Sequence, residues 1–292
     1  MRQNDEGSKP LQEEKFQKGA ALRSASDALE AAAGILIDWD GCIAVANQPS
    51  HWAIPFIQKY LSKIAIVSNN STQLPEDFAR ILGNSGVKIS RDRILLAGVE
   101  AVHRAAERRP RGALILGDGR LKGYARSLEV PIVQDRADVV VLLRDTRFSY
   151  SRLERAINCL REGARLIVAN PDITHPGRDN RVVPETGILY AALVAGAGGA
   201  NIDVETIGKP GPRLFVRACQ ALGVGPGAAV MIGDNPTTDI AGADALGMQS
   251  ILVGGRSEIN LQDLISLSTE SGLAFPKEYP YEAGADSHKI GR

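Results

Sequence analysis

Short apolar runs recur along most of this chain, separated by segments long enough to form helices. The runs consist mainly of Ile, Leu, Val and Ala, and they lie at 35–37, 64–67, 113–116, 139–143, 165–169, 229–232 and 250–253. Short, continuous runs of this kind between amphipathic segments are typical of parallel strands that helices cover on both faces. The pattern therefore predicts an α/β fold with a doubly wound parallel sheet.

Helix signals lie between these runs. Pro75, Ser149 and Pro212 each open a segment with apolar residues at helical spacing, and Gly163 and Gly223 close two of these segments. Residues 262–268 also carry a helical pattern. The uncharged run at 186–202 is shorter than the ~20 residues of a membrane span. Because it is rich in glycine and alanine, it predicts a buried helix of small residues.

The charge and cysteine content exclude several classes of protein. The chain has 292 residues, with 34 Lys+Arg against 34 Asp+Glu, so it lacks the basic excess of a general nucleic-acid binder. Its three cysteines are far apart and show no metal or redox spacing. The polar N-terminal stretch lacks the apolar segment of a secretory signal. We therefore expect a cytoplasmic protein that binds neither nucleic acid nor membrane.

Polar residues gather where the predicted strands end and where one helix begins. They are Asp38 and Asp40 after the first run, Ser68 and Asn69 after the second, Lys209 before a helix, and Asp234, Asn235 and Asp239 after the run at 229–232. Ligands of open parallel sheets bind at the carboxyl ends of the strands. Carboxylates suit Mg²⁺, and a lysine suits a phosphoryl oxygen. The set therefore suits a divalent cation together with a phosphoryl group.

Taken singly, these residues also have structural interpretations. Asp38 alone is typical of a turn at a strand end, Lys209 alone of a solvated charge, and Asp239 of a structural carboxylate. The stretch 68–71 is typical of a helix N-cap, a role that is compatible with binding an anion. Asn170, Asp172 and His175 follow another predicted strand and suit a turn stabilised by side-chain hydrogen bonds.

Four motifs in a fixed order carry a family resemblance. D-x-D-G at 38–41, S-N-N at 68–70, G-K-P at 208–210 and G-D-x-x-x-T-D at 233–239 resemble the haloacid-dehalogenase superfamily of phosphohydrolases. The segments 113–130, 137–172 and 185–199 resemble the α/β cap of its p-nitrophenyl phosphatase, pyridoxal-phosphate phosphatase and sugar-phosphatase-like branch. The resemblance implies a Rossmann-like core at 34–110 and 204–270 with a cap inserted at 111–203. Residues 1–33 would be a surface extension and 271–292 a tail.

This resemblance also implies a chemistry. The protein would be a Mg²⁺-dependent phosphatase of small phosphorylated metabolites. Asp38 would be the nucleophile that forms an aspartyl-phosphate, and Asp40 the general acid and base. The metal would be held by Asp38, the backbone carbonyl of Asp40, and Asp234. Asp239 would act from behind these groups, orienting Lys209 or a metal-bound water, and Asn235 would be an additional contact around the metal.

The remaining site residues would bind the substrate. By the same resemblance, Ser68, Asn69 and Lys209 would hold the phosphoryl group, and a cap loop with Asn170, Asp172 and His175 would select the rest of the substrate. The resemblance alone also suggests a homodimer that forms through the cap. A non-catalytic phosphate-ligand sensor or scaffold and a phosphotransferase are the alternatives on the same fold.

Three residues depart from the family pattern. Trp39 is bulkier than the usual aliphatic residue between the two aspartates, and Cys42 replaces a common Thr or Val. We expect both to alter the shape of the pocket near the leaving group. Glu185 stands where the family often has glycine, and the sequence assigns it no role.

Overall fold

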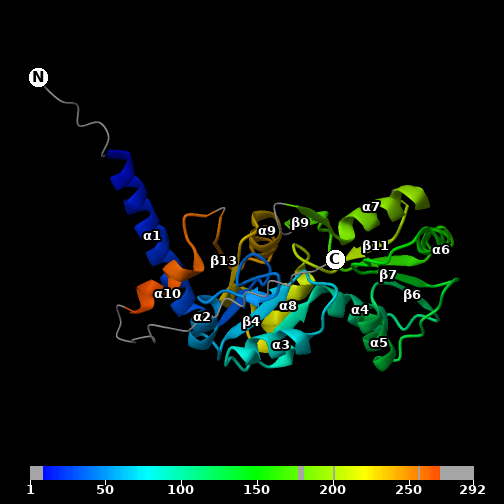
Figure 1. Ribbon diagram of the computed structural model, residues 1–292, viewed down its shortest axis with the longest axis horizontal. Coiled ribbons are helices and arrows are strands. Elements are labelled where there is room, and N and C mark those ends of the chain that lie inside the picture. The colour runs from blue at the N-terminus through cyan, green and yellow to red at the C-terminus, as the bar shows by residue number, and fades with distance from the viewer. Residues whose placement is uncertain (1–8, 177–180, 200, 256, 270–292) are drawn as a thin grey trace, which may run out of the picture.

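The computed structural model describes residues 9–176, 181–199, 201–255 and 257–269, which form two parallel sheets (Figure 1). The core sheet has the order β13-β12-β1-β4-β5, with β1 Gly34–Ile37, β4 Ile64–Ser68, β5 Ile94–Leu96, β12 Ala229–Gly233 and β13 Gln249–Leu252. The cap sheet has the order β11-β8-β7-β6, with β6 Ala113–Leu116, β7 Val139–Leu142, β8 Arg165–Val168 and β11 Val204–Thr206. This arrangement confirms the predicted α/β fold.

Helices and two small hairpins complete the described part of the chain. The helices are α1 Lys9–Ala31, α2 Ala53–Lys59, α3 Pro75–Asn84, α4 Ala97–Glu107, α5 Gly119–Ser127, α6 Tyr150–Arg161, α7 Thr186–Ala197, α8 Pro212–Leu222, α9 Ala241–Asp244 and α10 Leu261–Thr269. The hairpins are β2 Ala44–Val45 with β3 Gln48–Pro49, and β9 Thr174–Pro176 with β10 Val182–Pro184. None of these helices combines the length and the apolar character that crossing a membrane requires.

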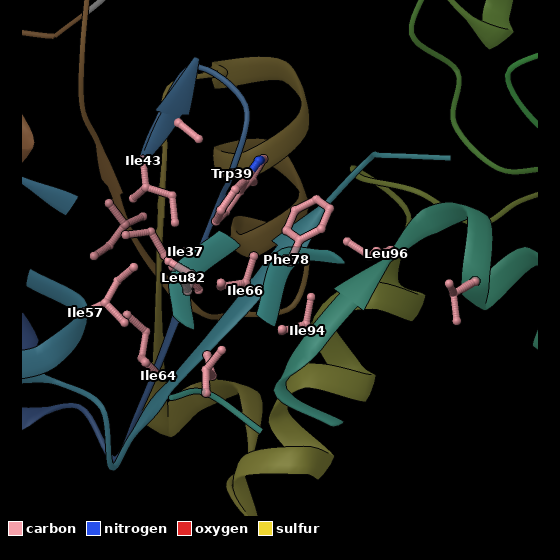
Figure 2. Packing of buried hydrophobic residues seen from close by; sticks show 14 of the residues in the cluster. Ile37, Trp39, Ile43, Ile57, Ile64, Ile66, Phe78, Leu82, Ile94 and Leu96 are labelled. Atoms are coloured by element: carbon pink, nitrogen blue, oxygen red, sulfur yellow. The ribbon is translucent and has the colours of Figure 1, made fainter. Parts of the chain in front are cut away.

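The core sheet is buried on both faces, as a doubly wound sheet requires. Ile35 and Ile37 of β1 pack into one apolar cluster, whereas Leu36 packs into the cluster on the opposite face. This alternation follows from the two-residue period of a strand. Figure 2 shows the first cluster, in which Trp39 lies beside Phe78 of α3 and Ile37 and Ile66 are members of the same cluster. Continuous apolar runs therefore form the central strands because both of their faces need apolar partners.

The predicted helix ends agree with the structure. α3 and α8 begin at Pro75 and Pro212, and α10 covers the helical pattern at 262–268. The side chain of Ser149 accepts a hydrogen bond at the start of α6. Gly223 ends α8 in the left-handed conformation, which glycine adopts at little cost.

The structure corrects two expectations about helices. The N-terminal segment is not merely a surface extension, because Ala25 and Leu29 of α1 are buried and α1 packs against α10. Residues 186–197 form the predicted helix α7, but this helix is not buried, since Ile188 is 40% exposed. Only one side of α7 contacts the rest of the cap, so its small residues reach the surface.

Two strands of the parallel sheets were not predicted. β5 is only three residues long and continues directly into α4. β11 is a half-buried edge strand of the cap sheet without an apolar run. Residues 204–206 therefore lie in the cap sheet, although we had assigned them to the core segment. The division of the chain into core and cap domains stays a prediction, and the predicted tail at 271–292 lies outside the described residues.

Candidate functional site

The site lies at the carboxyl ends of the three central core strands. β1 pairs with β12 on one side and with β4 on the other, and all three are parallel. Asp38 directly follows β1, Ser68 ends β4, and Asp234 directly follows β12. The backbone amide of Asp38 donates to the carbonyl oxygen of Ile232 at 2.9 Å, which continues the sheet pairing into the site. The register of the sheet thus brings together residues that are far apart in the sequence.

Lys209 lies at the centre of this group and is buried. Its Nζ is 2.5 Å from Oδ1 of Asp38 and 2.6 Å from Oδ1 of Asp239, and it donates to the carbonyl oxygen of Val67 at 3.0 Å. Burial alone would lower the pKa of Lys209, but the charges of Asp239 and Asp38 outweigh this effect and raise the pKa. Lys209 is therefore a fixed positive charge, as a group that binds phosphoryl oxygens needs to be.

Three carboxylates lie close enough to share one cation. One oxygen of each of Asp38, Asp234 and Asp239 lies within 4.8 Å of the others. Burial raises the pKa of Asp38, and so do the charges of Asp239 and Asp234, while Lys209 opposes them. The side chain of Asp40 is not part of this cluster, and its Oδ2 lies instead 3.4 Å from the hydroxyl of Ser68.

Two glycines make room for these carboxylates. Gly41 has a φ of +87°, and a Cβ there would lie 2.5 Å from Oδ2 of Asp234. A Cβ on Gly233 would collide with Asp239. Behind the cluster, the amide of Asn235 donates to Oδ2 of Asp239 at 3.1 Å, whereas the Asn235 side chain accepts from Thr237. Asn235 thus positions Asp239 through its backbone.

Of the two predicted catalytic aspartates, Asp40 is more exposed than Asp38. Asp38 is 6% exposed, whereas Asp40 belongs to the exposed residues. The protein atoms around the Asp40 carboxyl still raise its pKa by desolvation, and the positive charges of Lys209, His175 and Arg144 partly oppose this rise. A carboxyl group in such a setting can donate a proton and accept it again.

Asn69 connects the core strand β4 to Lys209 and to the cap. Its side chain accepts from the amide of Lys209 at 2.7 Å and donates to the carbonyl of Lys209 at 3.1 Å and to Oδ2 of Asp172 at 2.9 Å. Asn170, which is buried, donates to the backbone carbonyl of Asn69 at 2.7 Å. Asn69 therefore lies behind Lys209, and Asn170 and Asp172 join the cap to the core.

The third predicted cap residue, His175, lies in a cluster with two charged residues. Its Nδ1 is 2.8 Å from Oε1 of Glu185, and the same oxygen is 3.3 Å from Nε of Arg144. Sequence reasoning did not select Arg144. The signal was available, because Arg144 directly follows the apolar run at 139–143, the position that identified the other site residues.

Trp39 does not shape the pocket as expected. The residue is completely buried, its ring centroid is 4.5 Å from that of Phe78, and its Nε1 donates to Asn47. In Figure 2 it lies among the apolar side chains of the core. Side chains alternate along an extended segment, so a residue between two site aspartates points away from the site. Cys42 is partly buried and lines a separate cavity of about 270 Å³ with Gly41 and Gly254.

Comparisons with known proteins agree with this geometry. A family model described as haloacid dehalogenase-like hydrolase matches residues 35–130, and one described as HAD-hydrolase-like matches residues 206–262. The dihydroxyacetone phosphatase of Corynebacterium glutamicum is 29% identical over 222 residues, which cover 75% of this chain and 79% of the relative.

Two solved structures share the fold. The 4-nitrophenylphosphatase of Thermotoga maritima has a TM-score of 0.73 at 27% identity, and the match covers 82% of this chain and 98% of that one. A glycerol phosphate phosphatase of Mycobacterium tuberculosis in complex with magnesium has a TM-score of 0.71 at 26% identity, covering 81% of this chain and 78% of that one. The chain therefore belongs to the haloacid-dehalogenase-like hydrolases, as a phosphatase of their capped branch with the p-nitrophenyl phosphatases and sugar phosphatases.

Proposed function

We propose that this protein hydrolyses small phosphomonoesters with Mg²⁺ and through an aspartyl-phosphate on Asp38. The observation that carries the proposal is the buried contact between Asp38 and Lys209, with Asp234 and Asp239 beside it. A carboxylate next to a fixed ammonium group and a cation site suits in-line attack on phosphorus, because phosphoryl transfer depends mainly on positioning and on neutralising charge.

The residues present fit a magnesium ion. Asp38 and Asp234 offer carboxylate oxygens from adjacent strand ends, and the resemblance adds the backbone carbonyl of Asp40. Mg²⁺ prefers such oxygen ligands and binds phosphate together with one or two carboxylates. A related phosphatase has been solved with magnesium. Bound there, the ion would neutralise the phosphoryl oxygens and polarise the phosphorus.

Two carboxyl groups divide the reaction into two balanced steps. In the first step, an oxygen of Asp38 forms a bond to phosphorus, the bond from phosphorus to the alcohol oxygen breaks, and Asp40 gives its proton to that oxygen. In the second step, Asp40 takes a proton from water as the water oxygen attacks phosphorus and the bond to Asp38 breaks. Lys209 and Ser68 bind the phosphoryl oxygens in both steps, while Asp239 and Asn69 hold Lys209 in place.

The identity of the relatives supports a small substrate. The proteins that resemble this chain include phosphatases named for dihydroxyacetone phosphate and glycerol phosphate. The cap loop with Asn170, Asp172 and His175 is joined to Asn69 by hydrogen bonds of Asn170 and Asp172, so we expect it to contact the part of the substrate that is not phosphate. A loop that closes over a core of this kind excludes water and selects the leaving group.

Two variants test the proposal with p-nitrophenyl phosphate and Mg²⁺. Asp38→Asn removes the nucleophile, and we expect no hydrolysis above background. Asp40→Asn leaves the first step less affected, because p-nitrophenolate departs without a proton, but it slows hydrolysis of the intermediate. We therefore expect a burst of about one p-nitrophenolate per active site, followed by slow turnover.

The same measurements separate the alternatives. Full activity of Asp38→Asn would contradict the mechanism. Mg²⁺-dependent binding of ligand by the wild-type protein without turnover would favour a sensor or scaffold. A phosphotransferase would release less free phosphate than leaving group in the presence of an acceptor alcohol, so the two products are counted in parallel.

A further inference from the structure

Three charged or titratable side chains of the cap form one cluster, which we call the cap triad: Arg144, His175 and Glu185. Oε1 of Glu185 is 3.3 Å from Nε of Arg144 and 2.8 Å from Nδ1 of His175. Its Oε2 accepts from the amide of Thr186 at 3.3 Å, at the start of α7. Glu185 is a half-buried residue whose Oε1 holds the other two side chains, while its Oε2 is held by the start of α7.

The cap triad lies next to the reacting groups. Arg144 follows β7, and its amide donates at 3.1 Å to the hydroxyl of Ser71, in the loop that also carries Ser68 and Asn69. His175 lies in β9, three residues after Asp172, whose carboxylate accepts a hydrogen bond from Asn69. The charges of Arg144 and His175 both act on the carboxyl group of Asp40. The triad thus lies beside the loop that carries Ser68 and Asn69, on the side of the site where the cap meets the core.

Arg144 retains the groups that an anionic ligand needs. Its Nε is paired with Glu185, and within the described parts of the chain neither of its terminal amino groups has a hydrogen-bond partner. Its side chain is 28% exposed, against 42% for that of His175. A guanidinium group with its Nε fixed presents two parallel donors, which match the two oxygens of a carboxylate or phosphate.

The triad is also poorly explained as a device for stability alone. An exposed or half-exposed ion pair contributes little to stability. An arginine and a histidine held beside a site that itself must take a phosphate group are useful when a further negative charge has to be bound. The core has Lys209 for the phosphoryl group, so Arg144 is available for a second anionic group.

We propose that the cap triad selects phosphomonoesters whose alcohol portion carries a carboxylate or a second phosphate close to the ester oxygen. Arg144 binds this anion through its terminal amino groups, His175 adds a hydrogen bond, and Glu185 is the positioning residue. The proposal rests on the proposed phosphatase function and names its substrate class.

A matched pair of substrates tests this assignment in the full-length protein with Mg²⁺. 3-Phosphoglycerate and glycerol 3-phosphate have the same number of carbons and differ by a carboxylate in place of a hydroxymethyl group. We expect the wild-type kcat/KM to be about 10-fold or more higher for 3-phosphoglycerate. Arg144→Leu should lower this value by about 10- to 100-fold, mainly through KM, as expected for the loss of hydrogen bonds to a charged group. The loss of kcat/KM for p-nitrophenyl phosphate should be clearly smaller, because this substrate has no second anionic group.

Three further variants make the result interpretable. Arg155→Leu removes an exposed arginine of α6 elsewhere in the cap, and we expect it to leave the preference unchanged. Arg144→Lys keeps the charge but loses the paired donors, so it should restore only part of the preference. Glu185→Gln should raise KM for 3-phosphoglycerate more than it raises KM for p-nitrophenyl phosphate. Hydrolysis of p-nitrophenyl phosphate shows in each case that the variant is folded.

The outcomes separate this inference from the proposed function. Equal wild-type kcat/KM values for the two glycerol derivatives, or a preference that survives in Arg144→Leu, would overturn the inference alone, provided that p-nitrophenyl phosphate is hydrolysed. A wild-type protein that hydrolyses none of the three compounds would overturn the proposed function and the inference with it. A preference that Arg144→Leu abolishes while Arg155→Leu keeps it supports both.

Discussion

The side chain of Asn69 binds both main-chain polar groups of Lys209. Its Oδ1 accepts from the amide of Lys209 at 2.7 Å, and its Nδ2 donates to the carbonyl at 3.1 Å. Gly208 permits this approach, since a Cβ there would lie 2.5 Å from Oδ1 of Asn69. The backbone of Lys209 is therefore held in place by the side chain of Asn69, which directly follows β4.

Replacing this side chain should displace Lys209 without removing it. We expect Asn69→Ala to lower kcat/KM for p-nitrophenyl phosphate by about 10- to 100-fold, because small displacements of positioning groups are costly in catalysis. It should also lower the free energy of unfolding by about 1–3 kcal/mol, since buried polar groups of Lys209 lose their partners. Steady-state kinetics and thermal unfolding measure both effects. Asn84→Ala, at the exposed end of α3, is the control and should change neither.

Magnesium should stabilise the folded protein through the cluster of Asp38, Asp234 and Asp239. A cation that binds only the folded state at 100 times its Kd adds about 2.7 kcal/mol to the free energy of unfolding. We expect the Tm to rise with Mg²⁺ in the wild type and to rise little in Asp234→Asn. Asp244→Asn, which changes an exposed carboxylate of α9, should respond like the wild type. Equal Mg²⁺ responses of Asp234→Asn and the wild type would exclude Asp234 as a ligand.

Alanine substitutions at two glycines with similar φ angles distinguish the cost of backbone strain from the cost of a steric clash. Gly41 and Gly86 have φ values of +87° and +80°, but only Gly41 has an atom of another residue within 4 Å of an added Cβ, namely the Asp234 carboxylate. Alanine at either position should cost about 1 kcal/mol of stability. Only Gly41→Ala should also weaken Mg²⁺ binding and lower the hydrolysis rate. Titration of the Tm with Mg²⁺ for both variants checks this, and equal titrations would show that the close approach is unimportant.

Asp77 should make the stability depend on pH. Burial raises its pKa, but hydrogen bonds from Arg120, the Leu74 amide and Arg80 outweigh this and hold the pKa below the ordinary value of 3.8. Its Oδ2 lies 2.6 Å from Arg120 of α5. A folded pKa below the unfolded one stabilises the protein above the unfolded value, and this contribution disappears as the pH falls through the folded pKa.

Asp77→Asn isolates this contribution, because the amide oxygen can still accept from Leu74. We expect the variant to be less stable than the wild type at pH 7 by about 1–2 kcal/mol. The difference should shrink as the pH falls below about 4. Urea unfolding at several pH values measures it. Glu76→Gln, which changes an exposed carboxylate paired with Arg91, should show no comparable difference at any pH.

The central strands could be predicted from the sequence because burial on both faces demands continuous apolar runs. Asp38, Ser68 and Asp234 came from the same logic, since parallel strands end at one edge of the sheet, whereas Lys209 was selected from its place before a helix and from the family resemblance. β5 and β11 were not predicted because a strand of three residues gives too short a pattern. In addition, β11 lies at the edge of the cap sheet and has no apolar run.

Other features depend on contacts between residues that are far apart in the sequence, and sequence patterns do not reveal such contacts. Leu22, Ala25 and Leu29 have helical spacing, but the surfaces on which α1 packs include α10, more than 200 positions later along the chain. The cap triad is similar, because Arg144, His175 and Glu185 come from three separate elements. Asn69 was selected as a phosphate-binding residue, which stays a prediction. Its side chain contacts the backbone of Lys209 and the carboxylate of Asp172, and its sequence position alone does not indicate these contacts.

The position of β1 in the middle of the core sheet has a consequence for protein synthesis. Gly34 pairs with Ala229, and the whole cap lies between these residues in the sequence. A nascent chain that has left the ribosome through residue 206 contains Asp38, Ser68 and the cap triad, but β1 still has one open edge and Lys209, Asp234 and Asp239 have not been added. On the proposed mechanism the site therefore stays incomplete until residues 229–239 have been added, and a translation product that ends before them would not hydrolyse the substrate.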